Sequence, residues 1–165
     1  VVTIARSHFG LPFDSRLKVI IGDGGHYIQQ AVKQQRHYDL LLIDAFDHEG
    51  LSESINGESF FDACRIILRK QGIMMINLWR TDIDLFEQIA WYLSRSFNEK
   101  LLYLPVMERG NVIVFCFPEQ VPPLTGKSLR TRAEVLAARS GIEYPDFLND
   151  LRKYNSKENK KLFKL

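Results

Sequence analysis

Apolar residues recur along the first hundred positions in two periods, one typical of strands and one typical of helices. Short apolar runs predict strands at Leu17–Ile21, Tyr38–Ile43 and Ile73–Leu78, the second of them apolar enough to be covered on both faces. Helical spacing predicts helices at residues 1–9, from Tyr27 to about Gln35, from Phe60 to a stop near Gly72, and at Asp82–Phe97. Strands therefore alternate with helices.

The pattern changes after residue 100. Two strand-like runs, Leu101–Val106 and Asn111–Phe117, flank a short turn and predict a hairpin. Prolines and a glycine then mark a boundary, beyond which Ser128–Arg139 and Asp146–Tyr154 predict two short helices.

This order of elements predicts an α/β fold. Strands that alternate with helices favour a doubly wound, Rossmann-like and mostly parallel sheet, to which the hairpin adds an antiparallel pair at one edge. We expect a partial Rossmann-like domain at residues 1–117 and a C-terminal helical extension with a basic tail at residues 118–165. In such sheets, ligands bind beyond the carboxyl ends of the strands.

Composition narrows the class of protein. The chain has 165 residues, of which 45% are hydrophobic and 25% charged, as expected for one globular domain. No apolar run approaches the roughly 20 residues that a membrane-spanning helix needs. The two cysteines, Cys64 and Cys116, lie in apolar stretches, which favours buried free thiols in a reducing compartment. We therefore expect a cytoplasmic protein without a disulfide framework.

Charge is unevenly distributed. Residues 152–165 carry six Lys or Arg and one Glu, so a net +5 there leaves −3 for the remainder of a chain whose total is +2. We interpret the basic tail as a solvated chain end and predict no nucleic-acid or membrane partner. Between Arg36 and Arg65 there are acids but no Lys or Arg, which favours a cationic ligand.

The first candidate site is the turn Gly22-Asp23-Gly24-Gly25 at the start of a predicted helix. Its carboxylate suits hydrogen bonds from an adenine amino group or a ribose hydroxyl. Capping of the following helix explains the same residues equally well. The turn is not a G-x-G-x-x-G phosphate loop.

The second candidate site is the acidic loop that follows the strand at Tyr38–Ile43. An alkylamine must lose a proton before its nitrogen attacks carbon, and a carboxylate at Asp44 suits that general-base role. Asp47 or Glu49 would hold the distal ammonium of a diamine. The alternative is an ordinary solvated acidic loop in which Asp44 caps the segment that follows it. No second His or Cys lies near His48 at zinc-like spacing, so we predict no metal site.

Taken together, these segments resemble the spermidine synthase, or polyamine aminopropyltransferase, family. The resemblance rests on Val19-Ile20-Ile21-Gly22-Asp23-Gly24, on Tyr38 to Asp47, on Phe60-Phe61 with a helix end at Leu68 to Gly72, and on Phe9 with Leu11-Pro12. It implies a methyltransferase-like fold and transfer of an aminopropyl group from decarboxylated S-adenosylmethionine to a polyamine such as putrescine. By this resemblance Asp23, within Gly22 to Gly24, would contact the adenine, Asp44 would be the general base, and Asp47 would help hold the polyamine.

The chain departs from the family in two respects. After the second loop aspartate the family usually has Pro and then Gly-Pro-Ala, where this chain has His48 and then Gly50-Leu51-Ser52. The family's glycine-rich first motif, ribose-binding acid and N-terminal β-domain should precede Val1, so we expect that the natural protein is longer. A degenerate relative that binds the nucleoside poorly is the other interpretation.

Three functions therefore remain open. The first is aminopropyl transfer by the full-length protein, with a small-molecule polyamine as substrate and no metal. The second is methyl transfer from S-adenosylmethionine on the same fold. The third is a non-catalytic relative, because a fold alone does not imply activity. The sequence also leaves a homodimer open.

Overall fold

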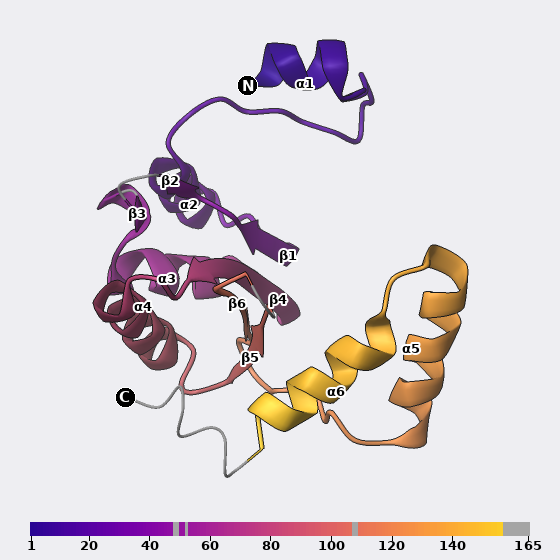
Figure 1. Ribbon diagram of the computed structural model, residues 1–165. Helices are drawn as coiled ribbons and strands as arrows, with labels where there is room; N and C mark the ends of the chain where they lie inside the picture. The colour runs from indigo at the N-terminus through magenta and orange to yellow at the C-terminus, as the bar shows by residue number, and fades with distance from the viewer. Residues whose placement is uncertain (48–49, 52, 107–108, 157–165) are drawn as a thin grey trace.

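The structure is a computed structural model that describes residues 1–47, 50–51, 53–106 and 109–156. Its helices are α1 (Val2–His8), α2 (Gly24–Lys33), η1 (Glu53–Ile55), α3 (Glu58–Ile66), α4 (Ile83–Ser96), α5 (Lys127–Ser140) and α6 (Tyr144–Tyr154). Its strands are β1 (Tyr38–Ile43), β2 (Phe46–Asp47), β3 (Gly50–Leu51), β4 (Leu68–Trp79), β5 (Leu101–Pro105) and β6 (Asn111–Cys116). The α/β fold class predicted from the sequence is confirmed (Figure 1).

The main sheet has four strands in the order β1-β4-β6-β5. β1 and β4 are parallel and are joined through α3, whereas β4, β6 and β5 pair antiparallel. The predicted hairpin therefore forms, and its second strand, β6, lies between β4 and β5. In the described residues the parallel part of this sheet is the β1–β4 pair.

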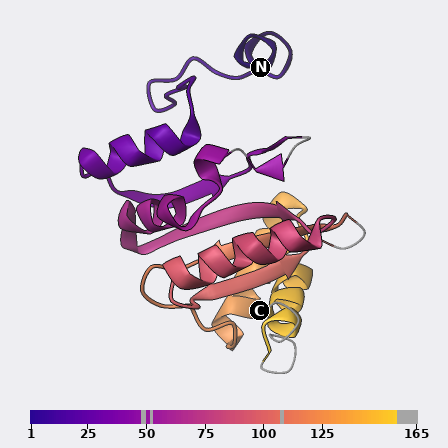
Figure 2. The same ribbon diagram turned by 90° about the vertical axis from the view of Figure 1, so that its left-hand side faces the viewer.

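The core lies on one face of the sheet, under α2, α3 and α4. From Gly72 to Leu78 every second residue of β4 is buried, and Met74, Ile76 and Leu78 are fully enclosed. α3 and α4 lie on this side of the sheet, and α5 and α6 lie on the other (Figures 1 and 2). This packing fixes α2 and α3 relative to the carboxyl ends of β1 and β4.

Aspartate side chains cap the starts of α2 and α4. The Asp82 carboxylate accepts a hydrogen bond from the backbone N–H of Leu85 at 3.0 Å, and α4 then runs with Asp84 early and Arg95 late. Opposite charges at these ends complement the helix dipole, as the sequence predicted.

The strand predicted at Leu17–Ile21 does not form. These residues have no regular secondary structure, and Ile21 is 85% exposed. A strand needs a partner for its backbone N–H and C=O groups. Among the described residues β1 pairs only with β4, and Leu17–Ile21 does not pair with the other edge of β1.

The helix predicted to stop at Gly72 ends earlier. α3 ends at Ile66, and β4 begins at Leu68, which pairs with Tyr38. The register then shifts, so that Leu40 pairs with Ile73. A Cβ atom on Gly72 would lie 3.0 Å from the Tyr38 carbonyl oxygen, so this glycine permits close strand contact rather than ending a helix.

The prediction that β1 is covered on both faces is also wrong for the described structure. Leu40 is 52% exposed and Leu42 is 64% exposed, because the helices next to β1 cover only the opposite face. The acidic segment after β1, predicted as a loop, contains the short β2–β3 hairpin and η1.

The last helix contacts the β5 edge of the sheet. α6 packs against β5, and the Asn155 side chain binds the backbone of that strand. Its Oδ1 accepts a hydrogen bond from the Tyr103 N–H at 2.9 Å, and its Nδ2 donates to the Tyr103 carbonyl at 2.8 Å. The division into domains at residue 117 stays a prediction.

Two further sequence predictions concern the cysteines and membrane segments. Cys64 and Cys116 are free and buried, and burial raises the pKa of both thiols above the ordinary value. Within the part of the chain that the structure describes, no helix has the length and apolar character needed to cross a bilayer.

Candidate functional site

A cavity of about 420 Å³ opens at the carboxyl end of β1, beside the start of α2. This volume is in the range of small-molecule sites. Its walls come from α2, β1, η1 and α3, and the residues that line it include Asp23, Tyr27, Ile28, Asp44, Ser54 and Phe60. The structure therefore brings the two aspartates singled out from the sequence, Asp23 and Asp44, into one cavity.

Asp23 is held in place from two sides. Its Oδ1 accepts a hydrogen bond from the His26 backbone N–H at 2.7 Å, which makes it the N-cap of α2. Its Oδ2 accepts a hydrogen bond from the Ser54 hydroxyl at 2.6 Å. The Ser54 hydroxyl, and after it the His26 N–H, hold the pKa of the Asp23 carboxyl below its usual value. The capping interpretation is confirmed, and a ligand contact at Asp23 stays a prediction.

The glycines around Asp23 have different surroundings. Gly22 and Gly24, both predicted to bind cofactor, line the cavity, and Gly24 has room for a methyl group. A Cβ atom on Gly25 would lie 2.2 Å from the Ser54 carbonyl oxygen. Gly25 is therefore the residue that lets η1 approach α2 and lets Ser54 reach Asp23.

Asp44 follows directly after β1 and is exposed at the cavity mouth. Asn77 of β4 donates a hydrogen bond from Nδ2 to Asp44 Oδ1 at 3.1 Å. Asn111 of β6 donates in turn from Nδ2 to Asn77 Oδ1 at 3.0 Å. The sequence analysis missed both asparagines, although Asn77 interrupts the apolar run from Ile73 to Trp79 and Asn111 begins the otherwise apolar β6.

The structure says less about the other acids of the loop. Asp47 is in β2 and is described by its backbone alone, and Glu49 lies outside the described residues. Their proposed contacts with a substrate therefore stay predictions.

Ion pairs neutralise part of the acidic stretch between Arg36 and Arg65. Asp39 pairs with Arg69 at 2.7 Å, and Glu58 pairs with Arg95 at 2.8 Å. Among the described residues Asp44 has no ion pair, so its negative charge is available to a cation in the cavity. The described residues contain no cluster of three or more His, Cys, Asp or Glu side chains arranged to hold a metal ion.

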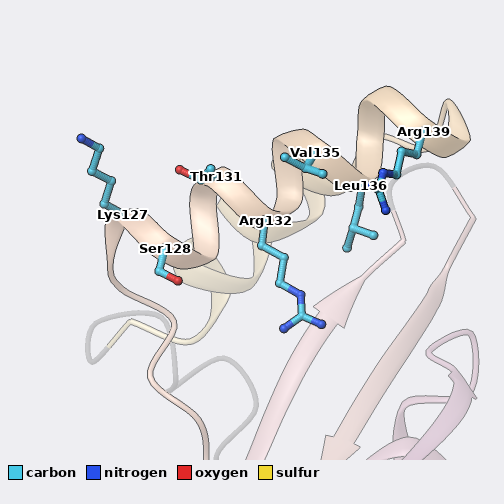
Figure 3. A pocket seen from close by; sticks show the side chains of 7 residues that line it. All are labelled: Lys127, Ser128, Thr131, Arg132, Val135, Leu136 and Arg139. Carbon is cyan, nitrogen blue, oxygen red and sulfur yellow. The ribbon is translucent and has the colours of Figure 1, made fainter.

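A larger hollow of about 650 Å³ lies along one face of α5 (Figure 3). Lys127, Arg132 and Arg139 line it together with Val135 and Leu136. It contains no carboxylate and belongs to the C-terminal helices, so it is separate from the cavity that contains Asp23 and Asp44.

The chain is similar to known proteins over most of its length. Residues 5–104 match the family model described as the spermine/spermidine synthase domain. The polyamine aminopropyltransferase of Neisseria meningitidis is 32% identical over 162 residues, and that of Chromobacterium violaceum is 31% identical over 157 residues. These alignments cover 97% and 94% of this chain and 60% and 58% of the two relatives. The chain thus spans less than two thirds of their length.

Methyltransferases are similar as well. Human methyltransferase-like protein 13 in complex with SAH has a TM-score of 0.66 at 24% identity, covering 94% of this chain and 68% of that one. The eEF1A lysine and N-terminal methyltransferase of Mus musculus is 30% identical over 146 residues, which are 82% of this chain and 20% of that protein.

Spermidine synthase from Thermotoga maritima has a TM-score of 0.57 at 20% identity, covering 71% of this chain and 42% of that one. At these identities the solved structures establish the methyltransferase-like fold, and the family assignment rests on the sequence. The matched segment includes both Asp23 and Asp44 and more than half of the chain. The resemblance noted from the motifs is thereby confirmed: this chain belongs to the spermine/spermidine synthase family.

Proposed function

We propose that the protein transfers an aminopropyl group from decarboxylated S-adenosylmethionine to a polyamine such as putrescine. The observation that carries this proposal is that Asp23 and Asp44 line one cavity, of about 420 Å³, in a chain of this family. The chain spans less than two thirds of its relatives' length, so the proposal concerns the activity of the whole protein.

Asp23 belongs to the nucleoside end of the proposed site. An ionised carboxylate has about four acceptor positions, so two internal hydrogen bonds leave room for the amino group of an adenine. The hydrogen bonds from Ser54 and His26 fix the direction of those remaining positions. Ile28 and Phe60 provide an apolar wall for the flat ring. Gly22 and Gly24 would border the nucleoside here.

Asp44 belongs to the reacting end. In the proposed step the acceptor nitrogen loses a proton to the Asp44 carboxylate and forms a bond to the aminopropyl carbon. The carbon–sulfur bond breaks and its electron pair stays on sulfur, which leaves neutral 5′-methylthioadenosine. Because the sulfonium is already a good leaving group, the protein's main tasks are to orient the amine and to remove its proton. Asp47 and Glu49 would hold the distal ammonium.

A second candidate function is methyl transfer from S-adenosylmethionine. The observation in its favour is the similarity to two methyltransferases, one in sequence and one in fold. A third candidate is a non-catalytic relative. The predictions of a cytoplasmic location, of no nucleic-acid or membrane partner, of no metal and of a homodimer as an option remain part of this proposal.

Calorimetry tests which donor the protein prefers. This chain and any longer natural form would each be titrated with decarboxylated S-adenosylmethionine, S-adenosylmethionine and 5′-methylthioadenosine. Tighter binding of the decarboxylated donor supports aminopropyl transfer, and tighter binding of S-adenosylmethionine favours methyl transfer. If no form binds any of the three, the non-catalytic interpretation stands.

Substitution of Asp44 tests the proposed base. Asp44→Asn keeps the shape and removes the proton acceptor, so turnover should fall by about 100-fold or more while the fold is retained. Asp84→Asn is the matched control, because Asp84 is an exposed aspartate on α4 outside the cavity. Equal turnover in the two variants would remove Asp44 from the mechanism.

A further inference from the structure

Side-chain hydrogen bonds connect Asp44, which follows β1, with Asn77 of β4 and Asn111 of β6. Ile43 pairs with Ile76, so Asp44 and Asn77 are the next residues along adjacent strands. Trp79 pairs with Asn111, which makes Asn111 a diagonal cross-strand neighbour of Asn77. The contacts of 3.1 Å and 3.0 Å therefore join three strands in one chain of hydrogen bonds.

The direction of these hydrogen bonds matters because an amide has a donor end and an acceptor end. Asn111 donates to Asn77 Oδ1 and so occupies the acceptor end of that amide. The donor end of Asn77 then faces Asp44 Oδ1. If Asn77 were reversed, its carbonyl oxygen would face a carboxylate oxygen, and this contact is repulsive unless Asp44 carries a proton.

We propose that Asn111 is a positioning residue for the reaction, acting through Asn77 on Asp44. By fixing the orientation of Asn77, it keeps a hydrogen-bond donor on Asp44 Oδ1 and leaves Oδ2 for the acceptor amine. This inference rests on the proposed function. It adds that the β5–β6 hairpin, through the first residue of β6, controls the base at the end of β1.

Positioning is important here because a general base works only within hydrogen-bond reach of the proton that it removes. Asp44 is exposed and lacks an ion pair among the described residues, so burial does not hold it. Asn77 and Asn111 are both half-buried and are built on strands. They therefore connect Asp44 to two strands of the main sheet.

Two substitutions of nearly equal size separate positioning from packing. Asn111→Asp replaces the donor by an acceptor, which favours reversal of Asn77 and places its oxygen against Asp44. Asn111→Leu removes the donor without favouring the reversed orientation. Asn149→Asp is the control, because it makes the same change of charge on the exposed face of α6.

The experiment measures aminopropyl transfer at saturating donor, with donor affinity measured by calorimetry. We expect Asn111→Asp to lower kcat by about 10- to 100-fold, the range that a hydrogen bond to a charged group supports. Asn111→Leu should lower it less, Asn149→Asp should leave it unchanged, and donor affinity should stay the same in all three. Equal kcat values for Asn111→Asp and Asn111→Leu would overturn the proposal.

A second readout does not need activity. The side-chain amide signals of Asn77 in a ¹⁵N NMR spectrum should shift in Asn111→Leu and in Asp44→Leu, and not in Asn149→Asp. If neither of the first two variants moves them, Asn77 does not link Asn111 to Asp44 and the proposal fails. If the amide signals move but the protein transfers no aminopropyl group, the hydrogen-bond chain stands and the proposed function fails.

Discussion

Gly25 lies in the first turn of α2 and leaves no space for a side chain. A Cβ atom there would be 2.2 Å from the carbonyl oxygen of Ser54, 2.9 Å from its carbonyl carbon and 3.0 Å from its Cβ. The two nearest atoms belong to the Ser54 backbone, which cannot rotate away as the end of a flexible side chain can. Gly25→Ala should therefore push η1 away from α2.

The size of the effect follows from this geometry. An ordinary contact begins at 3.4 Å, so the Ser54 carbonyl must move by about 1 Å. Overpacking of this kind costs about 1–3 kcal/mol, whereas alanine in a helix gains at most about 1 kcal/mol over glycine. We expect a net loss of about 1–2 kcal/mol, or a fall in Tm of about 2–8 °C for a domain of this size. The 2.6 Å hydrogen bond from Ser54 to Asp23 should lengthen or break.

Urea unfolding followed by circular dichroism measures this loss. Gly24→Ala is the matched control for stability, because its Cβ would lie 3.7 Å from the Ile55 side chain, an ordinary contact. It should therefore be as stable as the parent or slightly more so. If Gly25→Ala unfolds at the same urea concentration as Gly24→Ala, the close approach of α2 and η1 is not real and the explanation of the Ser54–Asp23 contact fails with it.

Three further predictions concern other parts of the structure. The lowered pKa of Asp23 contributes stability that is present above its ordinary pKa of 3.8 and is lost as the pH falls through the lower folded value. Ser54→Ala should raise the Asp23 pKa in an NMR titration. An unchanged pKa would contradict the Ser54–Asp23 contact. Asn155→Ala should cost about 1–3 kcal/mol in urea unfolding, because it removes the two hydrogen bonds between the Asn155 side chain and the Tyr103 backbone. A loss no larger than that of Asn149→Ala would refute this role. Both cysteines are buried and have raised thiol pKa values, so a thiol reagent at pH 8 should label them only after unfolding, and rapid labelling of the native protein would disprove their burial.

Local pattern was sufficient for several elements. β1 has the bounds expected for Tyr38–Ile43, and α4 lies inside the helix predicted over Asp82–Phe97. The hairpin of β5 and β6 was also predicted correctly. In each case the signal is within the segment itself, as an apolar run, a helical stripe with a capping acid, or two runs around a turn.

Pairing between distant segments explains the errors. Leu17–Ile21 has the composition of a strand, but a strand forms only where another backbone can accept and donate its hydrogen bonds. β4 begins at Leu68, well before the predicted Ile73, because Leu68 pairs with Tyr38 some thirty positions earlier. Neither fact is visible in the local sequence.

The candidate site also has some features that the local sequence predicts and others that depend on contacts between distant segments. The sequence by itself placed Asp44 at the carboxyl end of a strand, where ligands bind in an α/β sheet, because the apolar run of β1 ends there. It also placed Asp23 at the start of a helix, because a glycine turn there precedes residues of helical period. Only the tertiary structure decided that Ser54 reaches Asp23, and that Asn77 and Asn111 support Asp44. The Asn77 and Asn111 contacts depend on the register of β1, β4 and β6, and the Ser54 contact depends on the close approach of α2 and η1. A hydrogen bond forms only when its two atoms lie about 3 Å apart, and that placement is set by the packing of distant segments.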